Sequence, residues 1–425
     1  MNLRFYNGKI LTGGADSPFA LAQGELHIRG SRIAAIGPQA DTDAVWDREI
    51  DLHGDLVLPG FKNAHTHSAM TFLRSNADDM PLESWLTEQV FPYEAKLTPD
   101  DIYILSKLAI AEYLTSGITA NFDMYLMPEP AAAASAACGF RTVLTGAVND
   151  FTQSVRQLED WYHTLNRLDP LISFLPGFHA EYTAAYALLK ELGQLARSLK
   201  APFYMHNAET PREVAACRER YGKTPSLLFE ELGIFDYGGG GFHCIYLSEP
   251  DLEVFQRHDI SAVTCPAANL KLASGIAPVG SLLAHGINVA IGTDGPAGNN
   301  ALDLFREMYL ISVLAKHRSF DAAALDAEQV LRMACAGGAK AMRLAEADCL
   351  AEGKLADLTV LSLNGPNMRP VNHPLKNIVY AGSKLNVRMT VVNGRILYED
   401  GEFYIGEDIG KIYENAAAVT KRLLR

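Results

Sequence analysis

Pro59-Gly60-Phe61-Lys62-Asn63-Ala64-His65-Thr66-His67 is the stretch of sequence that decides the fold. The run before it, from Asp55 to Leu58, is short and apolar and predicts a strand that Pro59-Gly60 punctuates. Residues i and i+2 of a strand face the same side, so His65 and His67 should point at one place. Two neutral imidazoles form half of a site for a divalent metal such as Zn²⁺. The rest of the chain must supply the other ligands.

The composition describes an ordinary globular protein. At 425 residues, with roughly 150 residues per domain as a guide, the chain predicts two or three domains, or one large barrel with a small partner. The formal net charge of −13 argues against nucleic acid or an anionic membrane surface as the main partner. Six cysteines without a C-x-x-C pair, and the lack of an apolar leader or 18-residue apolar run, predict a cytoplasmic location.

Both ends of the chain carry short β signals. Residues 1–57 contain the strand-like runs Leu3–Tyr6, Glu25–Arg29 and Arg32–Ile36, and residues 351–425 contain Ala356–Leu361, Ile378–Tyr380 and Met389–Tyr398. Asn393-Gly394 within the last run predicts a hairpin. One small β-sandwich built from both ends is the simplest interpretation, and an amphipathic helix over Ile409–Leu423 should pack onto the body.

The middle of the chain, residues 58–350, alternates strands with helices. Thr98-Pro99-Asp100-Asp101 is a capping box that opens a helix running to Gly117. The expected strands are Leu56–Leu58, Ile118–Phe122, Arg141–Thr145, Leu171–Gly177, Phe203–His206, Gly241–Cys244, Ser261–Cys265 and Val289–Gly292. Eight strands alternating with helices predict an α/β protein with a (β/α)8 TIM barrel.

Polar residues follow several of these strands at the end where barrel enzymes place their chemistry. His206 and His243 end two strands, Asp294 follows a third, and His179 follows the run Leu171–Gly177. A lone histidine would signify little, but four strand ends that deliver such residues beside His-x-His indicate a metal site.

Longer motifs add a resemblance. Pro59-Gly60-Phe-x-Asn63-x-His65-x-His67, His206-x-x-Glu209-Thr210, His243-Cys244 and Gly292-Thr293-Asp294-Gly295 resemble the amidohydrolase superfamily over nearly the whole chain. Met80-Pro81-Leu82-Glu83-Ser84-Trp85-Leu86 and the run NLKLASGIAPV from Asn269 to Val279 are most similar to the 5'-methylthioadenosine/S-adenosylhomocysteine (adenosine) deaminase family.

The resemblance implies a metal-dependent hydrolase that removes the amino group of 6-aminopurine nucleosides. His65, His67, His206 and Asp294 would hold one Zn²⁺ per chain, which lowers the pKa of water to roughly 7. Glu209 would carry the proton to ring N1, and His243 with Asp294 would orient the attacking oxygen. The run Leu171–Gly177 has no lysine for a two-metal bridge, which favours one metal.

The substrate residues follow from the same resemblance. Glu83 resembles the acceptor of the ribose diol, His179 the histidine that contacts the purine, and Arg156 an arginine near the 5' group. Two departures from the family stand out: an arginine is missing near Gly146, and Cys265 replaces a frequent histidine. The first departure predicts that 5'-methylthioadenosine or adenosine is preferred over S-adenosylhomocysteine.

Two other functional classes remain open. A guanine, cytosine or triazine deaminase or dechlorinase would share the metal site, although Glu83 favours a ribosyl substrate. A non-catalytic scaffold relative would be expected to have lost metal ligands, and this chain keeps them together with Glu209. The partner is then a small nucleoside, and the sequence leaves open whether the protein forms a homo-oligomer.

Overall fold

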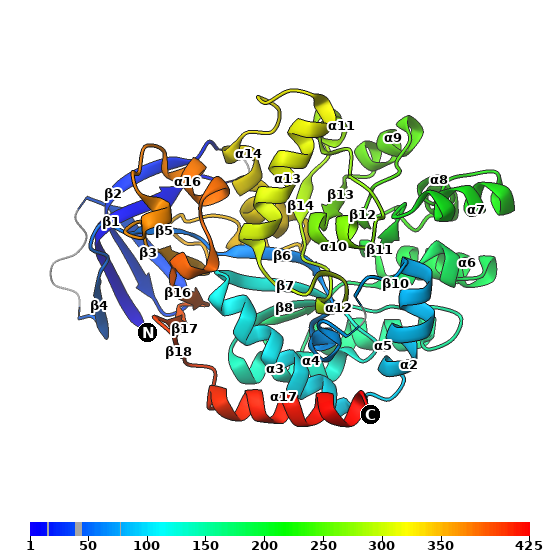
Figure 1. Cartoon of the computed structure of the whole chain (residues 1–425), viewed down its shortest axis with the longest axis horizontal. Coiled ribbons are helices and arrows are strands. Elements are labelled where there is room, and N and C mark those ends of the chain that lie inside the picture. Colours follow the sequence, from blue (N-terminus) through cyan, green and yellow to red (C-terminus); the bar gives the residue numbers. More distant parts are fainter. Residues whose placement is uncertain (15–16, 39–44, 77) are drawn as a thin grey trace.

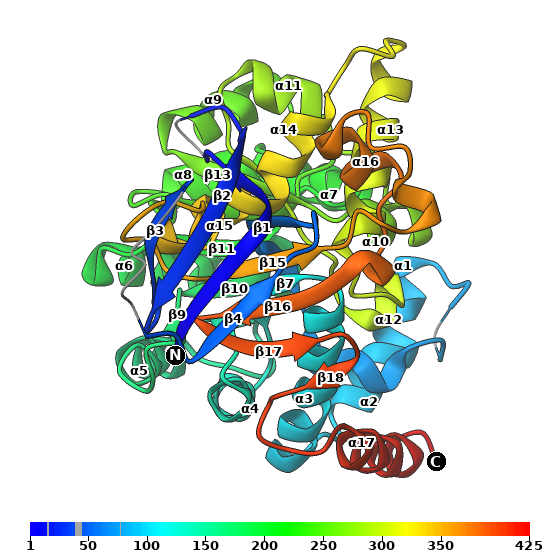
Figure 2. The same cartoon turned by 90° about the vertical axis from the view of Figure 1, so that its left-hand side faces the viewer.

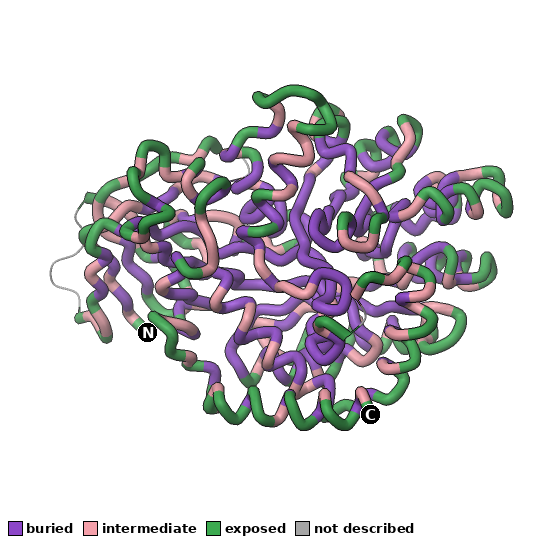
Figure 3. Tube along the Cα trace, in the orientation of Figure 1, coloured by how far each residue is buried: buried purple, intermediate pink, exposed green. Residues whose placement is uncertain are grey.

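The computed structural model describes residues 1–425 except 15–16, 39–44 and 77. A sheet built from both chain ends lies beside a large α/β barrel, and the red helix α17 (Ile409–Leu423) runs along the barrel (Figure 1). The barrel interior is buried, whereas exposed residues gather on the outer helices and loops (Figure 3).

The small sheet joins the two ends of the chain strand by strand. Its order is β18-β17-β16-β15-β5-β1-β2-β3, with β4 also paired to β1. The strands are β1 (Asn2–Thr12), β2 (Ala20–Arg29), β3 (Arg32–Gly37), β4 (Arg48–Asp51), β5 (Leu56–Pro59), β15 (Leu358–Leu361), β16 (Val387–Val392), β17 (Arg395–Glu399) and β18 (Glu402–Phe403). Apolar residues from both ends share one core that includes Phe5, Ile28 and Val391. Figure 2 shows the strands of the two chain ends side by side in this sheet.

The barrel consists of two parallel sheets that hydrogen bonds join into a ring. One contains β6 (Phe61–Thr66), β7 (Ile118–Met124), β8 (Arg141–Thr145) and β9 (Ile172–Phe174); the other contains β10 (Gly177–Ala180), β11 (Phe203–Asn207), β12 (Gly239–His243), β13 (Ile260–Thr264) and β14 (Val289–Ile291). The His179 amide donates to the Val148 carbonyl at 3.0 Å, and the Thr293 amide donates to the His65 carbonyl at 3.1 Å. β9 and β10 are two parts of one strand position, because the Leu175 amide between them donates to the Leu144 carbonyl of β8 at 2.9 Å and β10 pairs with the segment that follows β8. The ring therefore has eight strand positions, and the (β/α)8 barrel prediction is confirmed.

Helices surround the ring in the order expected of alternating strands. They are α3 (Pro99–Thr115), α4 (Pro128–Cys138), α5 (Val155–Leu165), α6 (Tyr186–Leu199), α7 (Pro211–Tyr221), α8 (Pro225–Leu232), α9 (Glu249–Arg257), α10 (Pro266–Lys271), α11 (Val279–Ala284), α12 (Pro296–Asn299), α13 (Leu304–Ser319), α14 (Ala327–Arg332) and α15 (Gly338–Ala341). Thr98 caps α3 through the capping box with Asp101, as predicted. No helix in the described part of the chain is long and apolar enough to cross a membrane.

The predicted first barrel strand is wrong. Leu56–Leu58 lies in β5, which pairs with β1 and β15 of the small sheet, and the first barrel strand is β6. The chain changes sheets at Gly60, where an added Cβ would lie 2.1 Å from the Thr119 side chain. Only a residue without a Cβ allows this close crossing.

Two further strand predictions need correction. The run Leu171–Gly177 is divided into β9 and β10, because Pro176 has no amide hydrogen to continue the ladder. The run Ile378–Tyr380 is part of helix α16 (Pro374–Tyr380). Leu375, Ile378 and Val379 are its buried residues, which is a helical spacing.

Candidate metal centre and cavity

The residues predicted from the strand ends converge on one site. His65 lies on β6 and His67 directly follows it, His206 lies on β11, His243 ends β12, and Asp294 follows β14. The His67 Nε2 and His65 Nε2 atoms lie 3.3 Å and 3.7 Å from Asp294 Oδ1. Ligand atoms of His65, His206 and His243 also lie within 4.8 Å of one another. The structure therefore brings all five side chains together.

Hydrogen bonds orient three of the imidazole rings. The Nδ1 atom of His67 lies 2.7 Å from the Met124 carbonyl oxygen, and that of His206 lies 2.7 Å from the His179 carbonyl oxygen. The Nδ1 atom of His243 lies 2.7 Å from Asn269 Oδ1. Each oxygen acceptor holds the proton on Nδ1, which leaves Nε2 as a metal ligand.

The fourth ring lacks such a partner. His65 is fully buried against Phe242, and neither of its ring nitrogens has a hydrogen-bond partner among the described residues. A buried polar atom without a partner is costly unless another group satisfies it. A divalent metal ion between His65 and Asp294 would satisfy Nε2, so the residues present fit such an ion.

Left-handed backbone positions aim several of these side chains. Ala208, His243 and Asp294 have φ values of +52°, +69° and +60°. The left-handed backbone conformation costs residues other than glycine free energy. They keep it where contacts with the surrounding structure compensate, often at functional sites. The chain therefore turns sharply at the ends of these strands, and the surrounding structure stabilises the turns.

Glu209 stands three residues beyond His206 and lines the same cavity. Its side chain is buried, and Ser274 Oγ donates to its Oε1 atom at 3.3 Å. Burial and the nearby Asp294 charge raise the pKa of Glu209, while His243 acts in the opposite direction. A buried carboxyl group beside a metal site is suited to move protons.

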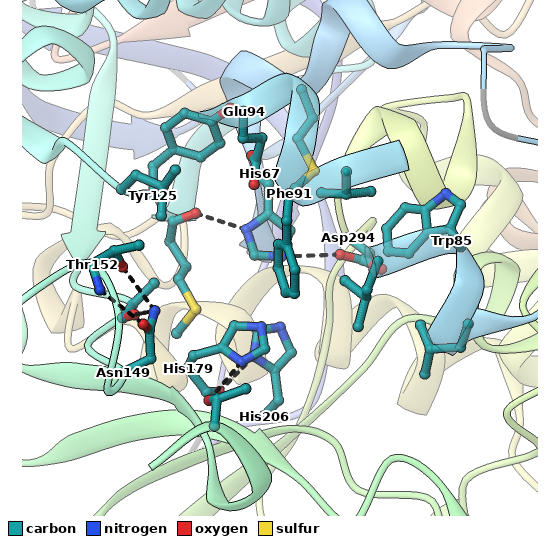
Figure 4. A pocket seen from close by; sticks show the side chains of 18 of the residues that line it. His67, Trp85, Phe91, Glu94, Tyr125, Asn149, Thr152, His179, His206 and Asp294 are labelled. Carbon is teal, nitrogen blue, oxygen red and sulfur yellow. Dashed lines mark hydrogen bonds and ion pairs between the residues drawn. The ribbon is translucent and has the colours of Figure 1, made fainter. Parts of the chain in front are cut away.

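A cavity of about 360 Å³ extends from this centre. Trp85, Phe91 and Glu94 line one wall, and Asn149 and Thr152 lie on the side opposite Asp294 (Figure 4). Glu94 ends α2 (Phe91–Glu94), and its Oε1 atom is buried without a hydrogen-bond partner in the described chain. Burial raises the pKa of Glu94 to about 7.

The three expected substrate residues occupy different places. His179 lines the cavity, and its Nδ1 atom lies 3.0 Å from Thr183 Oγ1. Burial lowers the pKa of His179 to about 4. Glu83, by contrast, has a side chain that is 66% exposed and pairs with the exposed Arg212. Arg156 is exposed on α5.

The structure therefore does not bring Glu83 or Arg156 to the cavity lining. Glu94 is the carboxylate that reaches this wall, and the sequence analysis missed it. The one local signal was that Glu94 closes the apolar, aromatic run Val90-Phe91-Pro92-Tyr93, where a carboxylate is the exception.

Comparison with known proteins agrees with the fold and the site. The model of the amidohydrolase family matches residues 56–397. A 5-methylthioadenosine/S-adenosylhomocysteine deaminase of Syntrophobacter fumaroxidans is 40% identical over 94% of this chain and 93% of its own. The crystal structure of a zinc-bound adenosine deaminase from Xanthomonas campestris is 31% identical, with a TM-score of 0.92 over 99% and 98% of the two chains.

A more distant structure shares the fold alone. The zinc complex of an atrazine chlorohydrolase from Arthrobacter aurescens is 22% identical, with a TM-score of 0.89 over 98% of this chain and all of the other. The family model spans most of this chain, and a relative of nearly equal length exceeds 30% identity. The chain therefore belongs to the amidohydrolase family.

Proposed function

We propose that this protein is a zinc-dependent deaminase of 6-aminopurine nucleosides, which converts substrates such as 5'-methylthioadenosine, adenosine or S-adenosylhomocysteine into the inosine derivative and ammonia. The observation that carries the proposal is one cavity with a metal-competent cluster and Glu209 on one side and, on another wall, the buried Glu94, whose Oε1 atom has no hydrogen-bond partner among the described residues. The names of the relatives support the same reaction.

One Zn²⁺ per chain, held by His65, His67, His206 and Asp294, would supply an activated water molecule. Water adds to C6; one of its protons goes to ring N1 and the other to the amino group, so that the C6–N bond breaks and ammonia leaves with one proton from the water. Glu209 accepts the water proton and delivers it to ring N1. His243 and Asp294 orient the attacking oxygen, and His179 contacts the purine.

Glu94 takes the place that the sequence analysis gave to Glu83. A ribose diol offers two hydroxyl donors, and a buried carboxylate oxygen without a partner is a strong acceptor for them. A bare base such as guanine or a triazine has no diol, so Glu94 favours the nucleoside over the other hydrolytic deaminases. The retained cluster together with Glu209 favours an enzyme over a non-catalytic scaffold.

Ammonia release from a panel of nucleosides and bases tests the proposal. Adenosine or 5'-methylthioadenosine should be turned over at least tenfold more efficiently than adenine, guanine, cytosine or a chlorotriazine. Efficient turnover of a bare base with none on the nucleosides would replace the proposed substrate class.

Three accompanying assignments are also proposals. The domain division at 57/58 and 350/351 is supported by the separate core of the small sheet. A cytoplasmic location is supported by six cysteines that are all free thiols. Small nucleosides would be the binding partners. Light scattering would measure whether the chain forms a homo-oligomer.

A further inference from the structure

Glu213 lies outside the cavity but contacts the backbone of the residue proposed to move the proton. It sits in the first turn of α7, where Thr210 is the N-cap and accepts from the Glu213 amide at 3.1 Å. Its carboxylate reaches back beyond that cap. Oε1 accepts from the Ala208 amide at 3.0 Å, and Oε2 accepts from the Glu209 amide at 2.8 Å.

The same peptide is held from its other side. The Ala208 carbonyl accepts from the amides of Ile245 and Tyr246, at 3.0 Å and 2.9 Å. Ala208 has a φ of +52°, a conformation that costs an L-residue free energy and needs support from its surroundings. Hydrogen bonds on both sides of Ala208 supply that support and fix where the chain emerges after His206.

Glu213 is a buried carboxylate that lies outside the cavity lining. Glu213 is 4% exposed, lies near the Glu209 charge, and is absent from the cavity lining. A buried carboxyl group is costly unless its hydrogen bonds compensate for the lost water. Here both of its oxygens are used on the backbone of Ala208 and Glu209, and Glu213 does not touch the space that substrate would fill.

We infer that Glu213 is a positioning residue that holds the Glu209 backbone, so that the Glu209 carboxylate stays aligned between the metal centre and the substrate ring. The inference rests on the proposed function, because it gives Glu209 the proton-transfer role. A misplacement of about 1 Å can cost about 10²-fold in rate, so a clamp of this kind acts on turnover more than on binding.

The test compares Glu213→Gln with a matched control, Asp251→Asn. Asp251 is also a buried carboxylate in the first turn of a barrel helix, α9, where its Oδ2 atom accepts from the Ser248 amide at 2.8 Å. Its hydrogen-bond partners among the described residues, Ser248 and Thr224, lie outside the site. Glutamine keeps the shape of Glu213 and points an NH₂ group at one of the two amides. For both zinc-loaded variants we would measure three quantities: kcat and KM with the best nucleoside, the zinc content, and the thermal midpoint.

We expect Glu213→Gln to lower kcat about tenfold to 10²-fold with KM changed less than about threefold and one zinc retained. Asp251→Asn should keep the kcat of the intact enzyme, even if its thermal midpoint falls by as much as that of Glu213→Gln. In a Glu209→Gln background, Glu213→Gln should cause no further loss of kcat, because residues that act as one unit are not additive. Equal kcat for Glu213→Gln and the intact enzyme, or additive losses in the double variant, would overturn the inference.

Hydrogen exchange, which needs no substrate, tests the clamp by Glu213 separately from the proposed catalytic function. Hydrogen exchange of the peptide that covers residues 203–212 should accelerate in Glu213→Gln and remain unchanged in Asp251→Asn. Unchanged exchange in Glu213→Gln overturns the clamp whatever the substrate is. Full activity of Glu209→Gln, by contrast, refutes the proposed proton-transfer role and with it the purpose of the clamp.

Discussion

At the scale of single residues, the proposed chemistry depends on the side chains gathered at the candidate metal centre and on the carboxylate that lines the cavity wall. The two-residue strand period and the strand ends predicted that His65, His67, His206, His243 and Asp294 converge, and both rules hold in the barrel. The choice of four of them as zinc ligands came from the family resemblance. Glu83 and Glu94 lie eleven residues apart, about three turns of an α-helix, which would place them on one face. The π-helical turn Trp85–Val90 changes the register between them. Glu83 was predicted from the resemblance of residues 80–86 to the deaminase family, and no pattern in the sequence marks the π-helical turn after which Glu94, and not Glu83, lines the cavity.

Glu209→Gln separates binding from chemistry. The variant should keep its zinc and its fold, because the metal cluster does not include Glu209, and should lose about 10²–10⁴-fold in kcat, the usual contribution of proton transfer. Metal analysis and steady-state kinetics measure both. Near-normal turnover would remove Glu209 from the mechanism.

Glu94→Gln tests the ribose contact, and Glu83→Gln is its matched control on the same segment. Burial raises the pKa of Glu94 to about 7, so the comparison is made at about pH 8, where Glu94 is mostly ionised. A hydrogen bond to a charged acceptor contributes about 1.5–3 kcal/mol, so 2',3'-dideoxyadenosine should be at least about tenfold poorer than adenosine for the intact enzyme. Glu94→Gln should erase most of that difference in kcat/KM, whereas Glu83→Gln should preserve it. The opposite result would assign the role of ribose acceptor to Glu83 instead of Glu94.

At the scale of elements, the pattern of alternating strands and helices was sufficient for the barrel but not for its borders. Strand β8 and helix α17 begin and end where the sequence predicted. The errors occur where tertiary contacts decide. β5 joins the small sheet through pairing with β15, which lies about 300 residues away in the chain, and no local signal reports such a partner.

Helix α17 offers a test of packing at this scale. Ile412 is 2% exposed within the barrel-facing core, whereas the adjacent Tyr413 is 50% exposed. Ile412→Ala should lower the free energy of unfolding by about 2–5 kcal/mol, because it removes buried methyl groups and leaves a cavity. Tyr413→Ala should change it by less than about 1 kcal/mol. Denaturant unfolding measures both, and equal effects would mean that α17 does not pack as described.

At the scale of the whole molecule, the arrangement of the ligand atoms predicts how many metal ions each chain binds. The described residues form two groups of ligand atoms that share His65, which suits one ion better than two separate sites. The zinc-replete protein should carry about one zinc per chain, and His206→Ala should lose most of it. Elemental analysis decides, and two tightly held metals per chain would contradict the single site.

The charge of the cavity bears on which nucleoside the enzyme prefers. Glu94, Glu209 and Asp294 line it, and no lysine or arginine does so among the described residues. S-adenosylhomocysteine carries a carboxylate that binds best to a bidentate arginine and is costly to bury without one. A methylthio group or a 5'-hydroxyl makes no such demand.

The kcat/KM value for S-adenosylhomocysteine should therefore be at least about tenfold below that for 5'-methylthioadenosine or adenosine, the size of one lost charged contact. Phe151, which lines the cavity and is 82% exposed, offers a place to supply the cation. Phe151→Arg should raise the relative kcat/KM for S-adenosylhomocysteine severalfold. Phe320→Arg, at a 91% exposed position outside the cavity, adds the same charge to the molecule and should leave the ratio unchanged. If S-adenosylhomocysteine were the best substrate of the unaltered enzyme, a cation from a neighbouring subunit would have to complete the site.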